Sequence, residues 1–263
     1  MTVTKYLAIF LCFGTCMLSG CGRQSQSVGD LQLDQAFLDR SARDLAFAAA
    51  EGDIREMDHL LARGVSVETK GIRGITPLWW AVWASETGVQ HLLEKGANPN
   101  VQPDGYASSM EVAAWYHSSR MLRLLIAHGG DVNLVSRDRF RHVPLHGANI
   151  ATSTENTRLL IAEHANLELP DSRGRTPFLH ACILFDYDQA IQLLEAGAKY
   201  SVTVKAHDGL INVWTELDRG GKRLPKDSPE EIYRQRLIKL LEERGAHRAA
   251  EPTVKPGAIR QDR

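Results

Sequence analysis

The sequence predicts an all-α solenoid of about six helix-turn-helix units joined by short hairpin loops. Two observations support this fold class. Leucine pairs recur along the chain, and almost every pair is followed three or four residues later by glycine. These positions lie 32, 33, 35 and 33 residues apart, with a last interval of 48, and such regular spacing is typical of stacked repeats. The pairs with their glycines are Leu60-Leu61 with Gly64, Leu92-Leu93 with Gly96, Leu124-Leu125 with Gly129, Leu193-Leu194 with Gly197, and Leu240-Leu241 with Gly245.

Each part of this pattern has a structural role. The leucine pair packs the second helix of a unit against its neighbours, and the glycine ends that helix in the left-handed conformation. One pair, Leu159-Leu160, has His164 where glycine is expected. Histidine is among the non-glycine residues that are enriched at positive φ, so we expect His164 to take the same conformation.

The starts of the units carry a second motif, which appears as Thr76-Pro77-Leu78, Val143-Pro144-Leu145-His146 and Thr176-Pro177-Phe178. Threonine caps a helix and proline fits its first turn. Together with the period, these segments resemble the Thr-Pro-Leu-His signature of ankyrin repeats. The resemblance covers residues 43–246 and implies a protein-binding solenoid whose hairpin tips and first helices line a concave side.

The units depart from the signature in several places. The first, Arg43–Lys70, is predicted to be an N-terminal cap aided by a helical segment near Leu31–Arg40. The third begins with Ser108-Ser109-Met110. The last begins near Asp208-Gly209, carries an insertion at Asp218–Pro229 and closes with a charged helix at Pro229–Arg244. We therefore predict a repeat domain at residues 31–246 with two caps and four internal repeats, and a disordered tail at residues 247–263.

The N-terminus reads as a targeting signal. Lys5 precedes an apolar run at residues 6–18 that is too short to span a bilayer. The segment Leu18-Ser19-Gly20-Cys21 resembles the lipobox of bacterial lipoproteins, which implies cleavage before Cys21 and its lipidation. We expect a signal peptide at residues 1–20, a tether at residues 21–30 and, because Gly22 is not aspartate, an outer-membrane lipoprotein facing the periplasm of a Gram-negative bacterium.

Composition and motifs argue against enzymatic and nucleic-acid-binding functions. The net charge is −1, which gives no overall attraction to nucleic acid. Catalytic signatures such as Gly-x-Ser-x-Gly or His-Glu-x-x-His do not occur. His142 and His146 are separated by Pro144 at a helix start, so we expect no shared helical face and no metal site. Cys182 has no expected disulfide partner and is predicted to pack in the core. No cofactor and no small-molecule substrate are predicted.

Aromatic residues form the first candidate partner-binding group. Trp83 and Trp115 occupy equivalent positions at the ends of first helices in adjacent units, where aromatic side chains would make strong binding contacts. The alternative is that they fill gaps between helices, and Trp80 is predicted to be core. The candidate contact residues are Trp79, Trp83, Trp115, Tyr106 and Tyr116.

Arginines at the hairpin tips form the second candidate group. Because tips of stacked repeats line up, these side chains predict a stripe that binds an acidic partner surface. The alternative is a solvated face in which they pair locally with Asp138 and Asp171. The residues are Arg73, Arg137, Arg139, Arg141, Arg173 and Arg175.

A narrower resemblance suggests a function. Residues 74–100 and 122–135 are similar to bacterial envelope ankyrin proteins found beside secreted toxins, some of which are immunity proteins against type VI secretion lipase effectors. This implies a protein that binds a lipase-like phospholipase toxin in the periplasm and neutralises it by occlusion. The alternative is a periplasmic scaffold or assembly factor for an envelope enzyme or complex. In either case the membrane is contacted through the lipid anchor alone.

Overall fold

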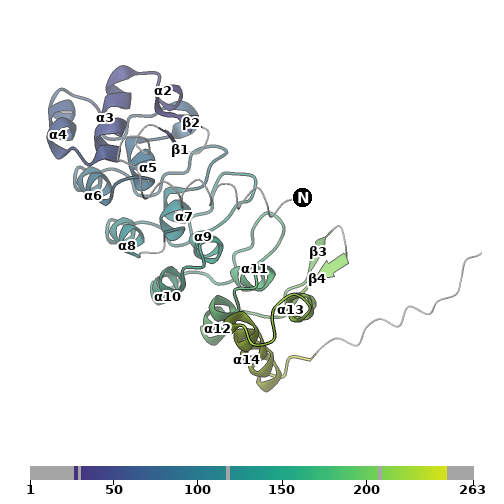
Figure 1. The fold of residues 1–263 in the computed structure, drawn as a ribbon. Helices are drawn as coiled ribbons and strands as arrows, with labels where there is room; N and C mark the ends of the chain where they lie inside the picture. The colour runs from purple at the N-terminus through teal and green to yellow at the C-terminus, as the bar shows by residue number, and fades with distance from the viewer. Residues whose placement is uncertain (1–26, 29–30, 117–118, 207–208, 248–263) are drawn as a thin grey trace, which may run out of the picture.

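A computed structural model describes residues 27–28, 31–116, 119–206 and 209–247. Two rows of helices form an elongated stack, and loops project from one row (Figure 1). Within the described residues there are six helix pairs, each with a first (inner) and a second (outer) helix. The predicted fold class, an all-α ankyrin-type solenoid, is confirmed.

The inner helices are α3 (Arg40–Glu51), α5 (Pro77–Val82), α7 (Ser109–Ala114), α9 (Pro144–Ile150), α11 (Pro177–Ile183) and α13 (Val213–Gly221). The outer helices are α4 (Ile54–Ala62), α6 (Glu86–Glu94), α8 (Arg120–Ala127), α10 (Thr154–Ala162), α12 (Tyr187–Glu195) and α14 (Pro229–Glu243). None of the described helices has the length and apolar character needed to cross a membrane.

Short strands add two antiparallel hairpins. Strand β1 (Ser27–Val28) pairs with β2 (Leu31–Gln32), which leads into the four-residue helix α2 (Leu33–Ala36). Part of the predicted tether is therefore paired backbone. Val28 within it is also buried in the hydrophobic core. Strands β3 (Val204–Ala206) and β4 (Gly209–Ile211) form the last hairpin before α13. The predicted signal peptide, Cys21 and residues 248–263 of the predicted tail lie outside the described residues.

The inner helices begin at the predicted caps. The Thr76 hydroxyl accepts a hydrogen bond from Trp79 N at 3.2 Å, and the Ser108 hydroxyl accepts one from Glu111 N at 3.1 Å. Val143 has no capping oxygen, and His146 Nδ1 instead accepts a hydrogen bond from the backbone N of Val143 at 3.3 Å. The sequence variation at the unit starts is thus compensated locally.

The ends of the outer helices confirm the glycine prediction. Gly64, Gly96 and Gly197 have φ values of 92°, 89° and 101°, in the left-handed region. His164, predicted to substitute for glycine, has φ of 60°. Each chain reversal is therefore fixed by one residue that tolerates this conformation.

The last unit differs from its predicted boundaries. The predicted insertion at Asp218–Pro229 begins inside α13, which continues to Gly221. The closing helix α14 runs from Pro229 to Glu243, as predicted. Arg234 on α14 reaches back to α13, where its Nη1 donates to Leu217 O at 3.0 Å while Glu231 holds its other nitrogens at 2.7 Å. This contact ties the two helices together, and it explains why the linking segment is shorter than predicted.

Stacking requires close backbone approach between units. Gly88 in the first turn of α6 faces Ala49 of α3, and a Cβ built there would lie 1.8 Å from the Ala49 carbonyl oxygen. A real Cβ cannot occupy that distance, so glycine is required by the spacing of the first two units.

We expect Gly88→Ala to destabilise the protein, although alanine is the better helix former. The methyl group must push α6 away from α3, and overpacking of this kind costs about 1–3 kcal/mol. Urea unfolding measures the change, with Thr87→Ala on the exposed side of the same helix as the control. An unfolding free energy equal to that of the wild type would contradict the required close contact.

Candidate partner-binding surface

Four aromatic side chains form a ladder on the inner side of units two and three. Trp79 contacts Trp83 and Tyr106 edge to face, with ring centroids 5.8 and 5.5 Å apart. Trp83 contacts Trp115 in the same manner at 5.5 Å. We call Trp79, Trp83, Trp115 and Tyr106 the aromatic ladder. Edge-to-face contacts of this kind stabilise the arrangement beyond simple burial.

The members of the ladder differ in exposure. Trp79 is 1% exposed, and its Nε1 donates to Ala107 O at 2.8 Å. The prediction that Trp79 contacts a partner therefore needs correction. Its buried indole instead supports the other rings of the ladder. Trp80 is fully buried, as predicted, and packs against Phe37.

Trp83 and Trp115 are half-buried and follow the last residues of α5 and α7, the equivalent positions predicted for them. Tyr106 and Tyr116 are also half-buried. The Tyr116 hydroxyl donates to Val82 O at 2.8 Å, so it links the third unit to the second. The exposed edges of these rings form a rigid apolar surface next to the hairpin tips.

The tips are joined to one another by backbone hydrogen bonds. Asp104 N donates to Arg73 O at 2.8 Å, and Gly105 N donates to Arg137 O at 3.1 Å. Ser172 N donates to Phe140 O at 2.7 Å in the same way. Because each tip is held by a neighbour, the loops form a continuous edge along the stack (Figure 1).

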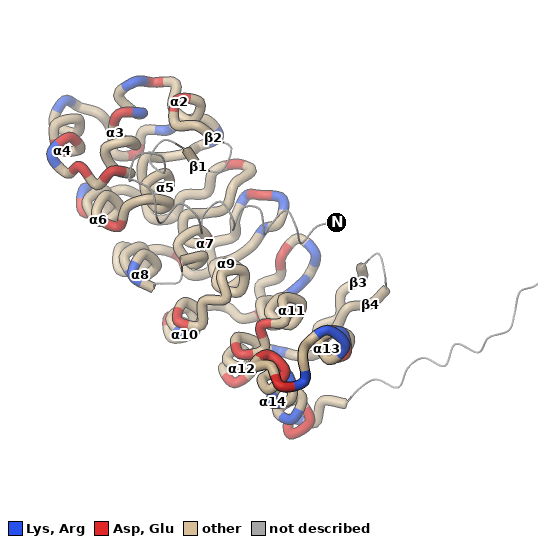
Figure 2. Tube along the Cα trace, viewed as in Figure 1, with Lys and Arg blue, Asp and Glu red and all other residues tan. Residues whose placement is uncertain are grey.

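Five of the six predicted tip arginines are exposed: Arg73, Arg137, Arg139, Arg141 and Arg173. Blue segments mark the loops that project from the inner helices between α7 and α11 (Figure 2). The guanidinium of Arg73 lies 5.7 Å from the centre of the Tyr106 ring, which connects the first arginine to the aromatic ladder. Arg137 pairs loosely with Asp104, with 3.8 Å between Nη1 and Oδ1.

Arg175 does not belong to the exposed group. Its side chain is 12% exposed, and its Nε donates to Asp171 Oδ2 at 2.6 Å. Burial acts to raise the pKa of Asp171, but hydrogen bonds from Arg175 and Arg173 outweigh it and hold the pKa below its ordinary value. Arg175 is therefore a structural partner of Asp171, and its assignment to the partner-binding stripe needs correction.

A buried polar cluster lies beneath the arginine tips. His142, His146 and His180 pack ring to ring, with centroids 5.1 to 5.4 Å apart. His142 Nδ1 lies 3.0 Å from Oε1 of buried Glu111, whose other oxygen accepts a hydrogen bond from Ser136. The cluster therefore joins the third, fourth and fifth units.

His142 and His146 share no helical face, as expected, because His142 comes from the tip loop rather than from α9. Their rings nevertheless stack on one another, a contact that the sequence did not predict. His146 is structural, as predicted, since its Nε2 lies 3.0 Å from Arg175 O. Among the described residues, no group of three histidine, cysteine or acidic side chains is arranged to hold a metal ion.

Burial controls the charge of the cluster. Burial, with a smaller contribution from the nearby His142, lowers the pKa of His146 to about 3. Burial also lowers the pKa of His180 well below its usual value, and it raises that of Glu111. The two histidines are therefore neutral at pH 7.

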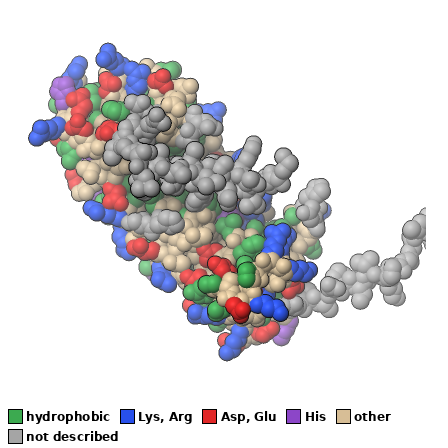
Figure 3. Space-filling model, in the orientation of Figure 1, with side chains coloured by type: hydrophobic (Ala, Val, Ile, Leu, Met, Phe, Trp, Pro, Cys, Tyr) green, Lys and Arg blue, Asp and Glu red, His purple; other side chains and the backbone are tan. Residues whose placement is uncertain are grey.

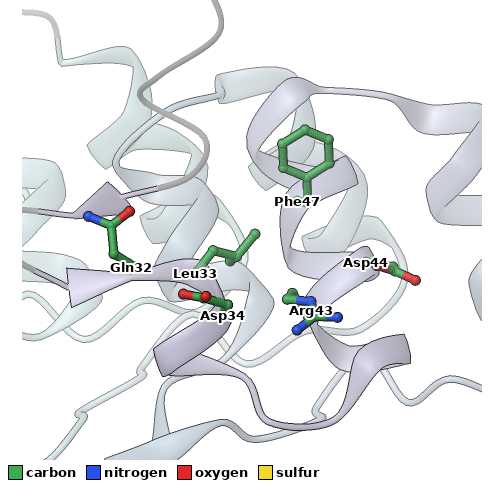
Figure 4. A pocket seen from close by; sticks show the side chains of 6 residues that line it. All are labelled: Gln32, Leu33, Asp34, Arg43, Asp44 and Phe47. Atoms are coloured by element: carbon green, nitrogen blue, oxygen red, sulfur yellow. The ribbon is translucent and has the colours of Figure 1, made fainter.

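Two shallow cavities lie at the two ends of the described chain. One of about 360 Å³ is lined by α2 and α3 residues, among them Asp34, Arg43 and Phe47 (Figure 4). The other lies between α13 and α14 beside Leu224 and Ile232. On the face shown in Figure 3, basic and acidic side chains are interspersed along the outer helices. The aromatic ladder with the tip arginines remains the candidate site.

Comparison with known sequences defines the class. Residues 109–204 match the family model for ankyrin repeats in three copies, and residues 73–104 match the one for a single ankyrin repeat. The chain therefore carries ankyrin repeats over these residues, and repeats of this kind are protein-interaction modules.

Individual relatives are bacterial and eukaryotic. The chain is 36% identical to Protein PhlB of Serratia liquefaciens over 134 residues, which covers 51% of this chain and 58% of PhlB. It is 28% identical to Putative ankyrin repeat protein YahD of Escherichia coli K12 over 174 residues, covering 62% and 83%. Human Ankyrin repeat and SOCS box protein 6 is 35% identical over 130 residues, covering 44% and 30%.

The histidine cluster predicts acid sensitivity. The unfolded chain takes up histidine protons below about pH 6.5, whereas folded His146 takes one up only near pH 3. The stability that this cluster contributes is therefore complete above about pH 6.5 and is lost as the pH falls from about 6.5 towards 3. We expect the melting temperature to fall between pH 7 and pH 5, and to fall less in His180→Leu.

Thermal melts at several pH values measure this dependence. The control is His59→Gln, which changes a histidine on the exposed surface of α4. If His180→Leu retained the full pH dependence of the wild type, the cluster would not be its origin.

Proposed function

We propose that this protein is a lipid-anchored periplasmic immunity protein that binds a lipase-like toxin of the type VI secretion system and occludes it. The observation that carries the binding surface is the aromatic ladder beside exposed tip arginines on one side of the stack. The toxin class in this proposal comes from the resemblance of residues 74–100 and 122–135 to immunity proteins.

Rigidity supports occlusion as the mechanism. The tips are held to one another by backbone hydrogen bonds, and the ladder residues contact one another across two units. A surface that is already ordered loses little conformational freedom on binding, so more of the contact energy appears as affinity. The protein needs only to cover the toxin's active-site entrance and does no chemistry itself.

The shape of the site also fits a protein better than a small ligand. Small-molecule sites are deep and bury most of the ligand. Here the half-buried rings of Trp83 and Trp115 lie at the ends of two inner helices, and the exposed arginines lie along the row of tips. A protein surface with an apolar centre and acidic neighbours would match both groups.

We expect the domain beginning after Cys21 to capture a lipase-like protein in equal proportion from the periplasm of its host. Trp83→Ala combined with Trp115→Ala is expected to abolish capture, because the exposed edge of the ladder is lost. Pull-down with mass spectrometry measures capture, and a melting curve of the double variant checks that it is folded.

Two further outcomes decide between the proposals. Inhibition of the captured enzyme's lipase activity by the wild-type domain alone would support occlusion. Recovery of a housekeeping envelope complex in place of a toxin would exclude immunity and favour the scaffold or assembly factor.

The anchor is tested separately. We expect Cys21→Ala to abolish incorporation of radiolabelled palmitate and to release the protein from the outer-membrane fraction, because the thiol is the predicted attachment point. Cys182→Ala is the matched control, since this buried thiol lies inside α11. Labelling that persists in Cys21→Ala would rule out lipidation at this residue.

A further inference from the structure

Two neighbouring tips use their own carboxylates to shape the loop. Asp138 Oδ1 accepts hydrogen bonds from the backbone N of Phe140 at 3.0 Å and of Arg141 at 2.8 Å. Asp171 Oδ1 accepts from the backbone N of Arg173 at 2.8 Å. These oxygens are turned towards the backbone, so the positive charge of the tips is left for other partners.

Arg141 stands at a position that favours glycine. Counted from the start of the following helix, it is equivalent to Gly74 and Gly174, which have φ of 79° and 77°. Arg141 has φ of 56°, in the same left-handed region. An unfavourable backbone at an exposed side chain is often kept because that side chain has a function.

The loop that carries Arg141 extends further than its neighbours. The bond from Ser136 N to His142 O closes it at 2.8 Å, whereas the tips of the second and fifth units are closed by Gly71 to Ile75 and by Asp171 to Arg175. The fourth tip is therefore two residues longer. The two extra residues lengthen the loop segment that carries Arg139 and Arg141.

The arginines of the two tips flank one inter-tip hydrogen bond. Ser172 N donates to Phe140 O at 2.7 Å. Arg139 and Arg141 are the chain neighbours of the acceptor residue Phe140, and Arg173 follows the donor residue Ser172. The guanidinium of Arg139 is stacked on Phe140, 4.5 Å from the ring centre. Within the described chain, no ion pair engages Arg141 or Arg173.

We propose that Arg139, Arg141 and Arg173 form a carboxylate cradle that binds an acidic segment of the partner protein. Guanidinium groups bind carboxylates in bidentate geometry, and the hydrogen bond between the tips joins the immediate chain neighbours of all three arginines. The proposal rests on the protein-binding function above and assigns the chemistry that the partner must present at this end of the surface.

A short acidic segment fits better than a long polyanion that runs along the whole row of tips. Asp104, whose side chain is 74% exposed, lies on the adjacent tip beside Arg137. Its negative charge would repel a nucleic acid strand or an anionic membrane lying along the tips. Separate carboxylates on a protein can meet the arginines and avoid Asp104.

The test uses Arg141→Gly in the domain that begins after Cys21. Glycine relieves the left-handed backbone, so we expect a higher melting temperature together with weaker binding. The probe is a fluorescein-labelled octaglutamate peptide, followed by fluorescence anisotropy at low salt. We expect Arg141→Gly to weaken the affinity at least fivefold. Arg158→Ala removes an exposed arginine from outer helix α10 and is the charge-matched control.

Opposite results would overturn the cradle. Equal loss of affinity in Arg158→Ala would indicate nonspecific charge attraction, and tighter binding of single-stranded DNA or phosphatidylglycerol vesicles would favour a different class of partner. Capture of a toxin that is unaffected by Arg141→Gly would exclude the cradle and leave the immunity function standing. Specific octaglutamate binding without any toxin captured would support the cradle and exclude the immunity function.

Discussion

Close contact between successive units is the constraint on which the structure depends. One helix pair buries too little apolar surface to be stable alone, so each must pack on a neighbour. At the N-terminal end this contact is so tight that Gly88 has no room for a side chain against Ala49. The same stacking brings the tips within hydrogen-bonding distance, and those bonds order the arginines. The binding surface is therefore a product of the packing and requires no element of its own.

The fold could be predicted from the sequence because its determinants are local. Thr76 as a cap and His164 at positive φ are consequences of neighbouring residues, and both are confirmed. The start of α14 is also marked locally, by Ser228 and Pro229. The end of α13 was misjudged because it depends on Arg234, a contact from a distant part of the unit.

The candidate site was harder to predict because exposure depends on how units lie against each other. Trp79 and Trp83 belong to the same aromatic segment, yet Trp79 is covered by the third unit and donates to Ala107. Arg175 resembles its exposed neighbours in sequence, but Asp171 withdraws it from the surface. No pattern in the sequence separates these cases.

The position of the histidine cluster also determines where the array is weakest. Solenoids commonly lose structure from their ends, where terminal units have one neighbour. Here the packed rings of His142, His146 and His180, together with Glu111, connect the third, fourth and fifth units in the interior of the stack. Charge introduced there would open an internal seam while both terminal caps kept their own contacts. The aromatic ladder of units two and three would then lose its fixed position relative to the arginines of units four and five, and a partner that contacts both would bind more weakly before the terminal units unfold.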